Sequence, residues 1–190
     1  MRNVVLLSAR LVLGGYLSVH GAQKLFGVFG GHGLDTTGQA FERIGLTPGR
    51  PMAALAGATE LAGGLLTASG VADPAGPLAI IGAMTVASAT HRANGPLAAR
   101  GGFELPVTNL AAAAALAAAG PGRLSLGPRL PRHLAAAAFG VGGLLAALSL
   151  AKLAAAQKRS AAGQRVPSAP APEEPVTPAE AGESSAGAEA

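Results

Sequence analysis

The feature that most constrains this chain is a series of long apolar stretches, separated by short segments that hold most of the charge. Residues 4–29 and 51–71 are the longest within the first half, and each matches the length of about 20 residues that a helix needs to cross a bilayer. Hydrophobic residues make up 49% of the chain and charged residues 13%, about half the charged fraction of a soluble domain. The pattern predicts an all-α integral membrane protein.

Four of these stretches are expected to pack as a polytopic membrane four-helix bundle over residues 4–127, with helices at 4–29, 51–71, 75–91 and 103–119. A further hydrophobic helix is expected at 134–156, where the alanine-rich sequence fits either a fifth span or a long surface helix. The remaining residues, 157–190, are rich in Pro, Ala and Glu and have little to bury, which predicts a disordered acidic tail.

The fifth stretch also decides the expected orientation. Cytoplasmic loops of membrane proteins carry an excess of Lys and Arg. With the N-terminus inside, four spans place nine basic residues inside and five outside, whereas five spans reverse that ratio. The sequence leaves both arrangements open.

Several polar residues interrupt the first stretch at helical spacing. Tyr16, His20 and Lys24 recur every four residues, with Gln23 beside them, so one helix face presents all four side chains. One interpretation is a ligand-binding surface. The other is that these residues mark the end of the helix, with Lys24 extending its ammonium group to the membrane surface.

Glu60 lies at the middle of the second stretch, where an ionised carboxylate needs a partner. It either handles protons or forms a structural clasp between helices. His91, at the end of the third stretch, is a second candidate for proton handling, with an ordinary interfacial position as the alternative. The candidate partners of Glu60 are Arg10, His20, Gln23, Lys24 and His91.

Other residue types limit the chemistry. The chain has no Cys, which excludes disulfides, thiolate catalysis and Cys-ligated metal centres within it. Its four His lack a regular ligand spacing, so no metal site is expected. Glu104 either contacts a ligand or favours the start of the fourth helix through the helix dipole. The basic balance fits loops at a membrane surface better than nucleic-acid binding.

Short motifs across about residues 8–127 resemble those of the DoxX family of bacterial membrane proteins. They include Arg10 to Gly14, His20 to Gly27, Phe41 to Pro48, Glu60 to Leu66, Gly70, His91, Gly102 to Glu104 and Gly120 to Leu126. One departure is Gly127, where relatives often carry an acidic residue.

The resemblance implies a four-helix bundle in the bacterial plasma membrane. Some relatives are linked to a thiosulfate:quinone oxidoreductase or to superoxide-detoxifying enzymes, which implies a small subunit of a membrane redox or oxidative-stress assembly with soluble redox enzymes as partners. Its ligand would be a quinone or a sulfur oxyanion, with no cofactor held by the chain itself. His20, Gln23 and Lys24 would then contact the ligand, and Glu60 and His91 would handle protons.

Two other functions remain open. One is a non-catalytic scaffold that recruits soluble enzymes to the bilayer, in which the polar residues only fix the packing of the helices. The other is a small transporter, which would require the chain to form a homo-oligomer with a shared pathway. The sequence does not settle whether the chain is itself part of an enzyme.

Overall fold

The computed structural model describes residues 1–163, and that part of the chain is helical, with no strand. The prediction of an all-α protein is therefore confirmed. Two 3₁₀ helices, Arg92–Asn94 and Ala98–Arg100, lie between the fourth and fifth α-helices. In chain order the α-helices are α1 (Arg2–Phe26), α2 (Gly33–Arg43), α3 (Gly49–Ser69), α4 (Ala75–His91), α5 (Glu104–Ala119) and α6 (Arg132–Gly163).

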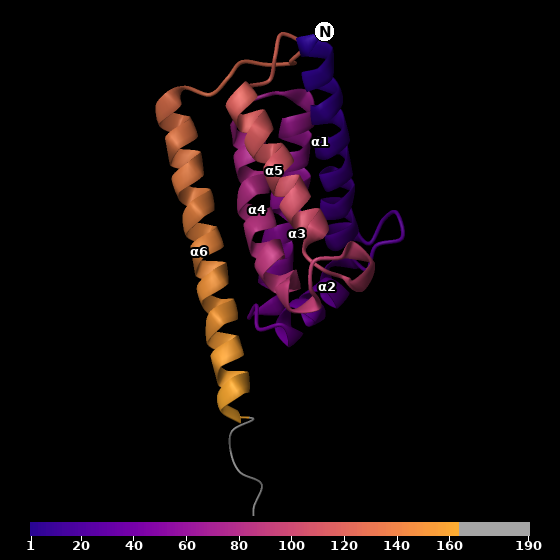
Figure 1. Cartoon of the computed structure of the whole chain (residues 1–190), viewed down its shortest axis with the longest axis vertical. Coiled ribbons are helices and arrows are strands. Elements are labelled where there is room, and N and C mark those ends of the chain that lie inside the picture. Colours follow the sequence, from indigo (N-terminus) through magenta and orange to yellow (C-terminus); the bar gives the residue numbers. More distant parts are fainter. Residues whose placement is uncertain (164–190) are drawn as a thin grey trace, which may run out of the picture.

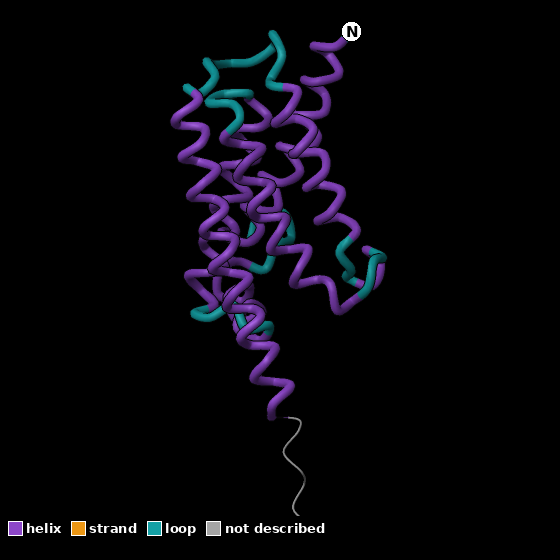
Figure 2. The backbone as a smooth tube through the Cα atoms, turned by 60° about the vertical axis from the view of Figure 1, so that its left-hand side comes forward, coloured by secondary structure: helices purple, strands orange, loops and turns teal. Residues whose placement is uncertain are grey.

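Four of the long helices form a closed bundle. α1 packs against α3, α3 against α4, α4 against α5, and α5 against α1. α6 runs along one side of the bundle and packs mainly against α4 (Figure 1). The loops gather at two ends (Figure 2). We call the end with the N-terminus and the α5–α6 loop the upper end, and the end with α2 and the α4–α5 loop the lower end.

Glycines fix where two helices end. α1 stops at Phe26 because Gly27 adopts a left-handed conformation, with φ 70°, and its N–H bonds to the Gln23 carbonyl. Gly70, with φ 73°, ends α3 in the same way. The apolar pattern had placed these two ends at 29 and 71, because it follows hydrophobicity and not the conformation of the backbone.

Glycines also let α1 and α3 approach closely. A Cβ atom built at Gly14 would lie 2.5 Å from the Gly64 carbonyl oxygen. One built at Gly21 would lie 2.5 Å from the Gly57 carbonyl oxygen. Both distances are too short for a side chain, so these positions bring the two backbones together, as small residues do between membrane helices.

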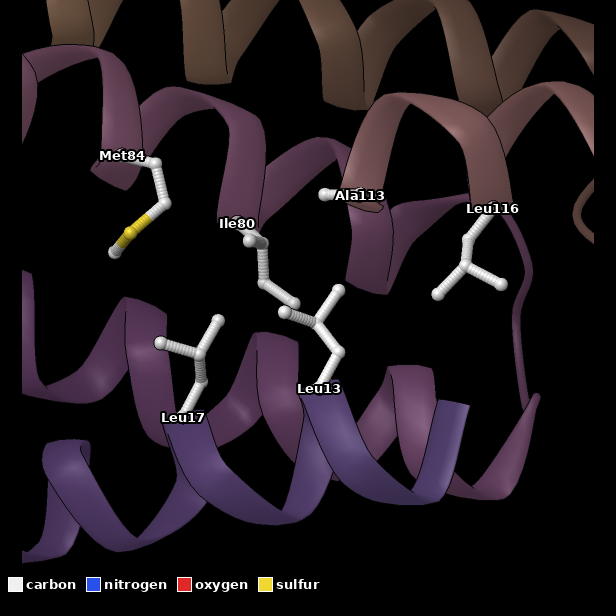
Figure 3. Close-up of a cluster of buried hydrophobic side chains, with 6 residues drawn as sticks. All are labelled: Leu13, Leu17, Ile80, Met84, Ala113 and Leu116. Carbon is white, nitrogen blue, oxygen red and sulfur yellow. The ribbon is translucent and has the colours of Figure 1, made fainter. Parts of the chain in front are cut away.

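The buried apolar core lies where α1, α4 and α5 meet (Figure 3). Ile80 of α4 and Ala113 of α5 are fully buried, and Figure 3 shows their side chains on the inner surface of the bundle. The other members of the cluster are Leu13 and Leu17 of α1, Met84 of α4 and Leu116 of α5. This core holds α4 in place and so positions the residues of its opposite face.

A buried arginine joins the upper end of the bundle. Arg10 of α1 is only 3% exposed. Its guanidinium group donates hydrogen bonds to the carbonyls of Pro121, of Ala68 at 3.1 Å and of Leu124 at 2.8 Å. One side chain therefore links α1, the end of α3 and the α5–α6 loop.

An ion pair between Arg129 and Asp73 also fixes this loop. Arg129 Nη2 lies 3.1 Å from a carboxylate oxygen of Asp73, which belongs to the α3–α4 turn. Burial raises the pKa of Asp73 above its ordinary value, although the hydrogen bond and charge of Arg129 act in the opposite direction. The Leu130 N–H also bonds to the Asp73 carbonyl, so the chain is tied down just before α6 begins.

α6 is longer than the apolar pattern indicated. It continues through Gly163, so residues 157–163 are helical and do not belong to the predicted tail. The segment contains Ala, Gln, Lys and Arg, all of which favour helices. The remainder of the predicted disordered tail, 164–190, lies outside the described residues.

Length and hydropathy alone identify two of the described helices as candidate membrane spans, α1 and residues Arg132–Ala162 of α6. α5 is apolar but shorter. Large apolar side chains are exposed on both candidate spans, among them Val12 on α1 and Leu144 on α6. These surfaces suit contact with lipid, and the architecture agrees with an all-α membrane protein.

Candidate functional site

An ion pair between α1 and α3 forms the polar centre of the candidate site. Lys24 Nζ, in the last turn of α1, contacts Glu60 Oε2 of α3. The Glu60 side chain is 7% exposed and that of Lys24 is 26% exposed. Among the candidate partners of Glu60, the structure selects Lys24. Removing either partner would leave the other charge without compensation in a poorly hydrated place.

This pair lies in the wall of a large cavity. The cavity has a volume of about 560 Å³ and is bounded mainly by α3, α4 and α6. Most of its lining is aliphatic. The lining includes Lys24 from α1, Leu55, Thr59 and Glu60 from α3, Ala75, Ala79, Gly82, Thr90 and His91 from α4, and Ala137, Ala138, Val141, Gly142, Leu145, Ala146 and Ser149 from α6.

The polar groups of this cavity lie in its middle and lower parts. Near the upper end, where α4 and α6 begin, the described lining consists of alanines, glycines and valine. The Lys24–Glu60 pair and Thr59 lie further down α3, and Thr90, His91 and Ser149 follow toward the lower end, where the wall also carries the large apolar side chains of Phe41, Ile44, Leu46 and Met52. The arrangement suits an elongated molecule with a polar group beside Lys24 and an apolar end toward the upper part of the cavity.

The cavity is open along the side between α3 and α6. Leu55 of α3 is 36% exposed, and Val141 and Leu145 of α6 are 62% and 39% exposed, although all three line the cavity. α6 packs mainly against α4, which leaves the α3 side of the cavity without a covering helix in the described part of the chain. In a bilayer this opening faces lipid.

His91 reaches the lower part of the cavity with a defined ring orientation. Its Nδ1 lies 2.7 Å from the Gly101 carbonyl oxygen. Because a carbonyl only accepts hydrogen bonds, Nδ1 carries the hydrogen, and Nε2 of the neutral ring is left as the acceptor. His91 and Glu60 line the same cavity, without a direct hydrogen bond between them in the described residues.

The other polar residues of the first helix lie outside the cavity lining. Tyr16 and His20 pack edge to face with ring centroids 4.4 Å apart, and Tyr16 is exposed. Gln23 donates to the Phe29 carbonyl at 3.0 Å and so closes the α1–α2 loop. Of the predicted face of four residues, the structure brings Lys24 to the cavity and places the other three elsewhere.

Glu104 orders the α4–α5 loop. Its carboxylate accepts a hydrogen bond from the Ala98 N–H at 2.9 Å, and it is not among the residues that line the cavity. Arg10, another candidate partner of Glu60, lies at the upper end and bonds to backbone carbonyls there. The structure therefore does not bring these two residues to the candidate site.

Sequence reasoning missed the contribution of α6. Small residues recur every four positions on one face of this helix, at Ala138, Gly142 and Ala146, and Ser149 follows three residues later. All four line the cavity. That spacing was visible in the sequence, but its meaning depends on which helix α6 lies beside.

Comparison with known proteins places the fold in a family. The DoxX family model matches residues 5–93. Residues 5–93 are therefore a DoxX family domain. The DoxX match covers α1 to α4, and α5 and α6 follow it. No curated protein and no solved structure matches the chain. Among residues 1–163, no group of His, Asp and Glu is arranged to hold a metal ion.

Proposed function

We propose that this DoxX protein is a multi-pass subunit of a redox or oxidative-stress assembly in the bacterial plasma membrane, and that it binds a quinone in the cavity between α3, α4 and α6. One observation carries the proposal: a largely apolar cavity of about 560 Å³ has in its wall the Lys24–Glu60 pair, whose carboxylate is buried and whose ammonium group is partly buried. Soluble redox enzymes would be its partners.

The size and lining of the cavity fit such a ligand. Small-molecule sites usually measure about 300 to 1,000 Å³ and combine apolar walls with a few placed polar groups. The ammonium group of Lys24 is a hydrogen-bond donor suited to a carbonyl oxygen of a quinone ring. The hydroxyl groups of Thr59 and Thr90 donate to the Leu55 and Ala87 carbonyls of their own helices. The aliphatic remainder of the wall suits the rest of the molecule.

The same features favour a quinone over a sulfur oxyanion. An oxyanion needs several donors and a surplus of positive charge. The charge of Lys24 is already balanced by Glu60, and most of the cavity wall is aliphatic. A neutral ligand therefore fits the cavity better.

The acidic and basic side chains have separate proposed roles. A quinone supplies two-electron chemistry coupled to two protons, and the electrons would come from a partner enzyme. Glu60 is the carboxyl group nearest the proposed ring position, and its contact with Lys24 gives it a defined orientation. His91, with Nε2 free at the lower part of the cavity, is placed to exchange protons with water.

The scaffold function gives the Lys24–Glu60 pair a purely structural role. The two proposals differ in what a neutral pair would do. Replacing both partners, as in Lys24→Met with Glu60→Gln, removes both charges and should recover stability that either single change loses. If the pair is only structural, the double variant should function normally. If the pair forms part of a binding site, the double variant should not.

Quinone binding to the full-length protein in lipid nanodiscs tests the proposal. We expect Glu60→Gln to weaken the binding of a short-tailed benzoquinone about tenfold, because Lys24 without its ion-pair partner no longer holds its ammonium group in place for a charge-assisted hydrogen bond to the ring, an interaction of that scale. We also expect the double variant to remain weak although its unfolding midpoint recovers. Asp35→Asn is the control, because Asp35 pairs with Arg50 on the exposed surface. Wild-type affinity in the double variant would favour the scaffold.

A further inference from the structure

α6 supplies a wall of the cavity although it lies beyond the residues that match the DoxX family. Ala138, Gly142 and Ala146 share the helix face that is turned toward α4, and each of them is half-buried. Gly140 and Gly143 lie on the opposite side and are exposed. One face of α6 therefore presents mainly small residues beside the cavity.

The absence of a side chain matters most at Gly142. A Cβ atom built on Gly82 of α4 would lie 3.5 Å from the Gly142 carbonyl oxygen, so the two helices are close at this level. A Cβ atom built on Gly142 itself meets no atom within 4 Å. Because Gly142 lines the cavity, a side chain added there would enter the cavity instead of a neighbouring helix.

The part of the cavity that α6 borders is apolar near the upper end. Its described lining there includes Ala75 and Ala79 from α4 and Ala137, Ala138 and Val141 from α6. These side chains offer no hydrogen bond to a polar ring, but they suit a hydrocarbon chain, which gains dispersion contacts against an aliphatic wall. The opening between α3 and α6 provides a route for that chain from the bilayer.

We propose that α6 forms the binding wall for the hydrocarbon tail of the quinone and that the missing side chain at Gly142 sets the room available to that tail. This inference rests on the proposed function, because it takes the polar ring to lie beside Lys24 and Glu60. It adds that the segment following the DoxX match determines which tailed molecules the protein accepts.

The test compares two probes on the full-length protein in nanodiscs: a benzoquinone with a tail of two isoprenoid units, and the same ring without a tail. Gly142→Leu should weaken binding of the tailed probe about tenfold or more, the usual scale for a steric change in an apolar pocket. The tail-free ring should bind this variant within about twofold of the wild type.

Gly143→Leu is the matched control, because a Cβ atom there also meets nothing within 4 Å, and its position is exposed. Both changes raise the helix propensity of α6 equally, so the control isolates the filling of the cavity. Its binding of both probes should match the wild type. Unfolding midpoints of the two variants confirm that both proteins are folded.

The outcomes separate this inference from the proposed function. If the wild type binds the tailed probe and Gly142→Leu binds it equally well, the assignment of α6 is overturned and quinone binding stands. If Gly142→Leu weakens both probes to the same extent, the tail does not lie against α6, and the inference is again overturned. If the wild type binds neither probe, both proposals fail together.

Discussion

Arg10 and Lys24 show how two cations on one helix take different roles. Arg10 is almost fully buried, and its planar guanidinium group serves three backbone carbonyls from two other segments. Lys24 makes a single ion pair and also borders a cavity. The three backbone acceptors around Arg10 indicate a structural role, whereas the cavity beside Lys24 indicates a role in ligand binding.

Replacing Arg10 with Lys should destabilise the protein without changing ligand binding directly. A single ammonium group cannot satisfy three carbonyls in the geometry of a guanidinium fork, and each buried acceptor left unpaired costs about 1 to 3 kcal/mol. We expect a loss of roughly 2 to 4 kcal/mol, measured as a lower unfolding midpoint in detergent.

Arg2→Lys provides the control on the same helix. Arg2 makes one exposed hydrogen bond, at 3.3 Å, to the Ala119 carbonyl, so its replacement should change stability by no more than about 0.5 kcal/mol. Equal effects of the two substitutions would contradict the role given to Arg10.

The sequence could identify Glu60 as an unusual residue but not its partner. A carboxylate in the middle of an apolar stretch is costly, and that alone drew attention to it. Choosing Lys24 from five candidates required the depth at which α1 and α3 cross, which depends on the glycine contacts at Gly14 and Gly21. The glycines of both helices indicate faces that allow close packing, but the sequence does not say which helix packs there or at what depth.

At the scale of elements, apolar pattern and turn residues predicted most of the helical content. The third long helix of the bundle, α4, has the predicted bounds 75–91, and its start follows the turn at Asp73 and Pro74. The predicted end of α1 was wrong because the left-handed conformation of Gly27 ends the helix before the apolar stretch is over. The length of α6 was misjudged because charged residues such as Lys158 continue a helix well.

α6 illustrates a different limit of prediction. Its alanine-rich sequence fits both a span and a surface helix, and the choice depends on its neighbours. In the structure it lies along α4 (Figure 1), held at the lower end by a hydrogen bond of 2.7 Å from Lys152 Nζ to the Thr47 carbonyl. That contact joins segments far apart in the chain, which no local pattern can anticipate.

At the scale of the whole molecule, the two ends differ in charge. In the described chain the lower end carries Lys24, Arg43, Arg50, Arg92, Arg100, Lys152, Lys158 and Arg159, and the upper end carries Arg2, Arg10, Arg123, Arg129 and Arg132. With α1, α3, α4, α5 and α6 as the proposed spans, the positive-inside trend places the lower end in the cytoplasm. The N-terminus would then lie outside.

Labelling of single introduced cysteines checks this orientation. Because the sequence has no native Cys, only the introduced thiol can react. Leu126→Cys introduces a thiol at an exposed position of the upper end, and Ala99→Cys does so at the lower end. A membrane-impermeant maleimide applied to intact cells should label Leu126→Cys, and should label Ala99→Cys only after permeabilisation. The reverse pattern would show that the N-terminus lies inside.

The cavity is the feature least accessible from sequence. It exists because α6 presents small residues at a distance from α3 that is set by the loop after Gly120, by packing of α6 against α4 and by the Lys152 contact at the lower end. Arg10, Arg129 and Asp73 hold that loop in place. Aliphatic side chains such as Ala79 and Ala138 carry no sign that they border open space. The family resemblance implied the ligand class and named His20, Gln23 and Lys24 as ligand contacts, but of these three only Lys24 borders the cavity.

Photo-crosslinking of the full-length protein in nanodiscs with an azido-substituted quinone tests the central claim most directly. Mass spectrometry should locate the label on cavity-lining segments of α3, α4 and α6, and an excess of unmodified quinone should suppress it. Labelling that competes with quinone but falls on the outer face of α1 around Tyr16 would contradict the account, as would labelling that quinone does not suppress.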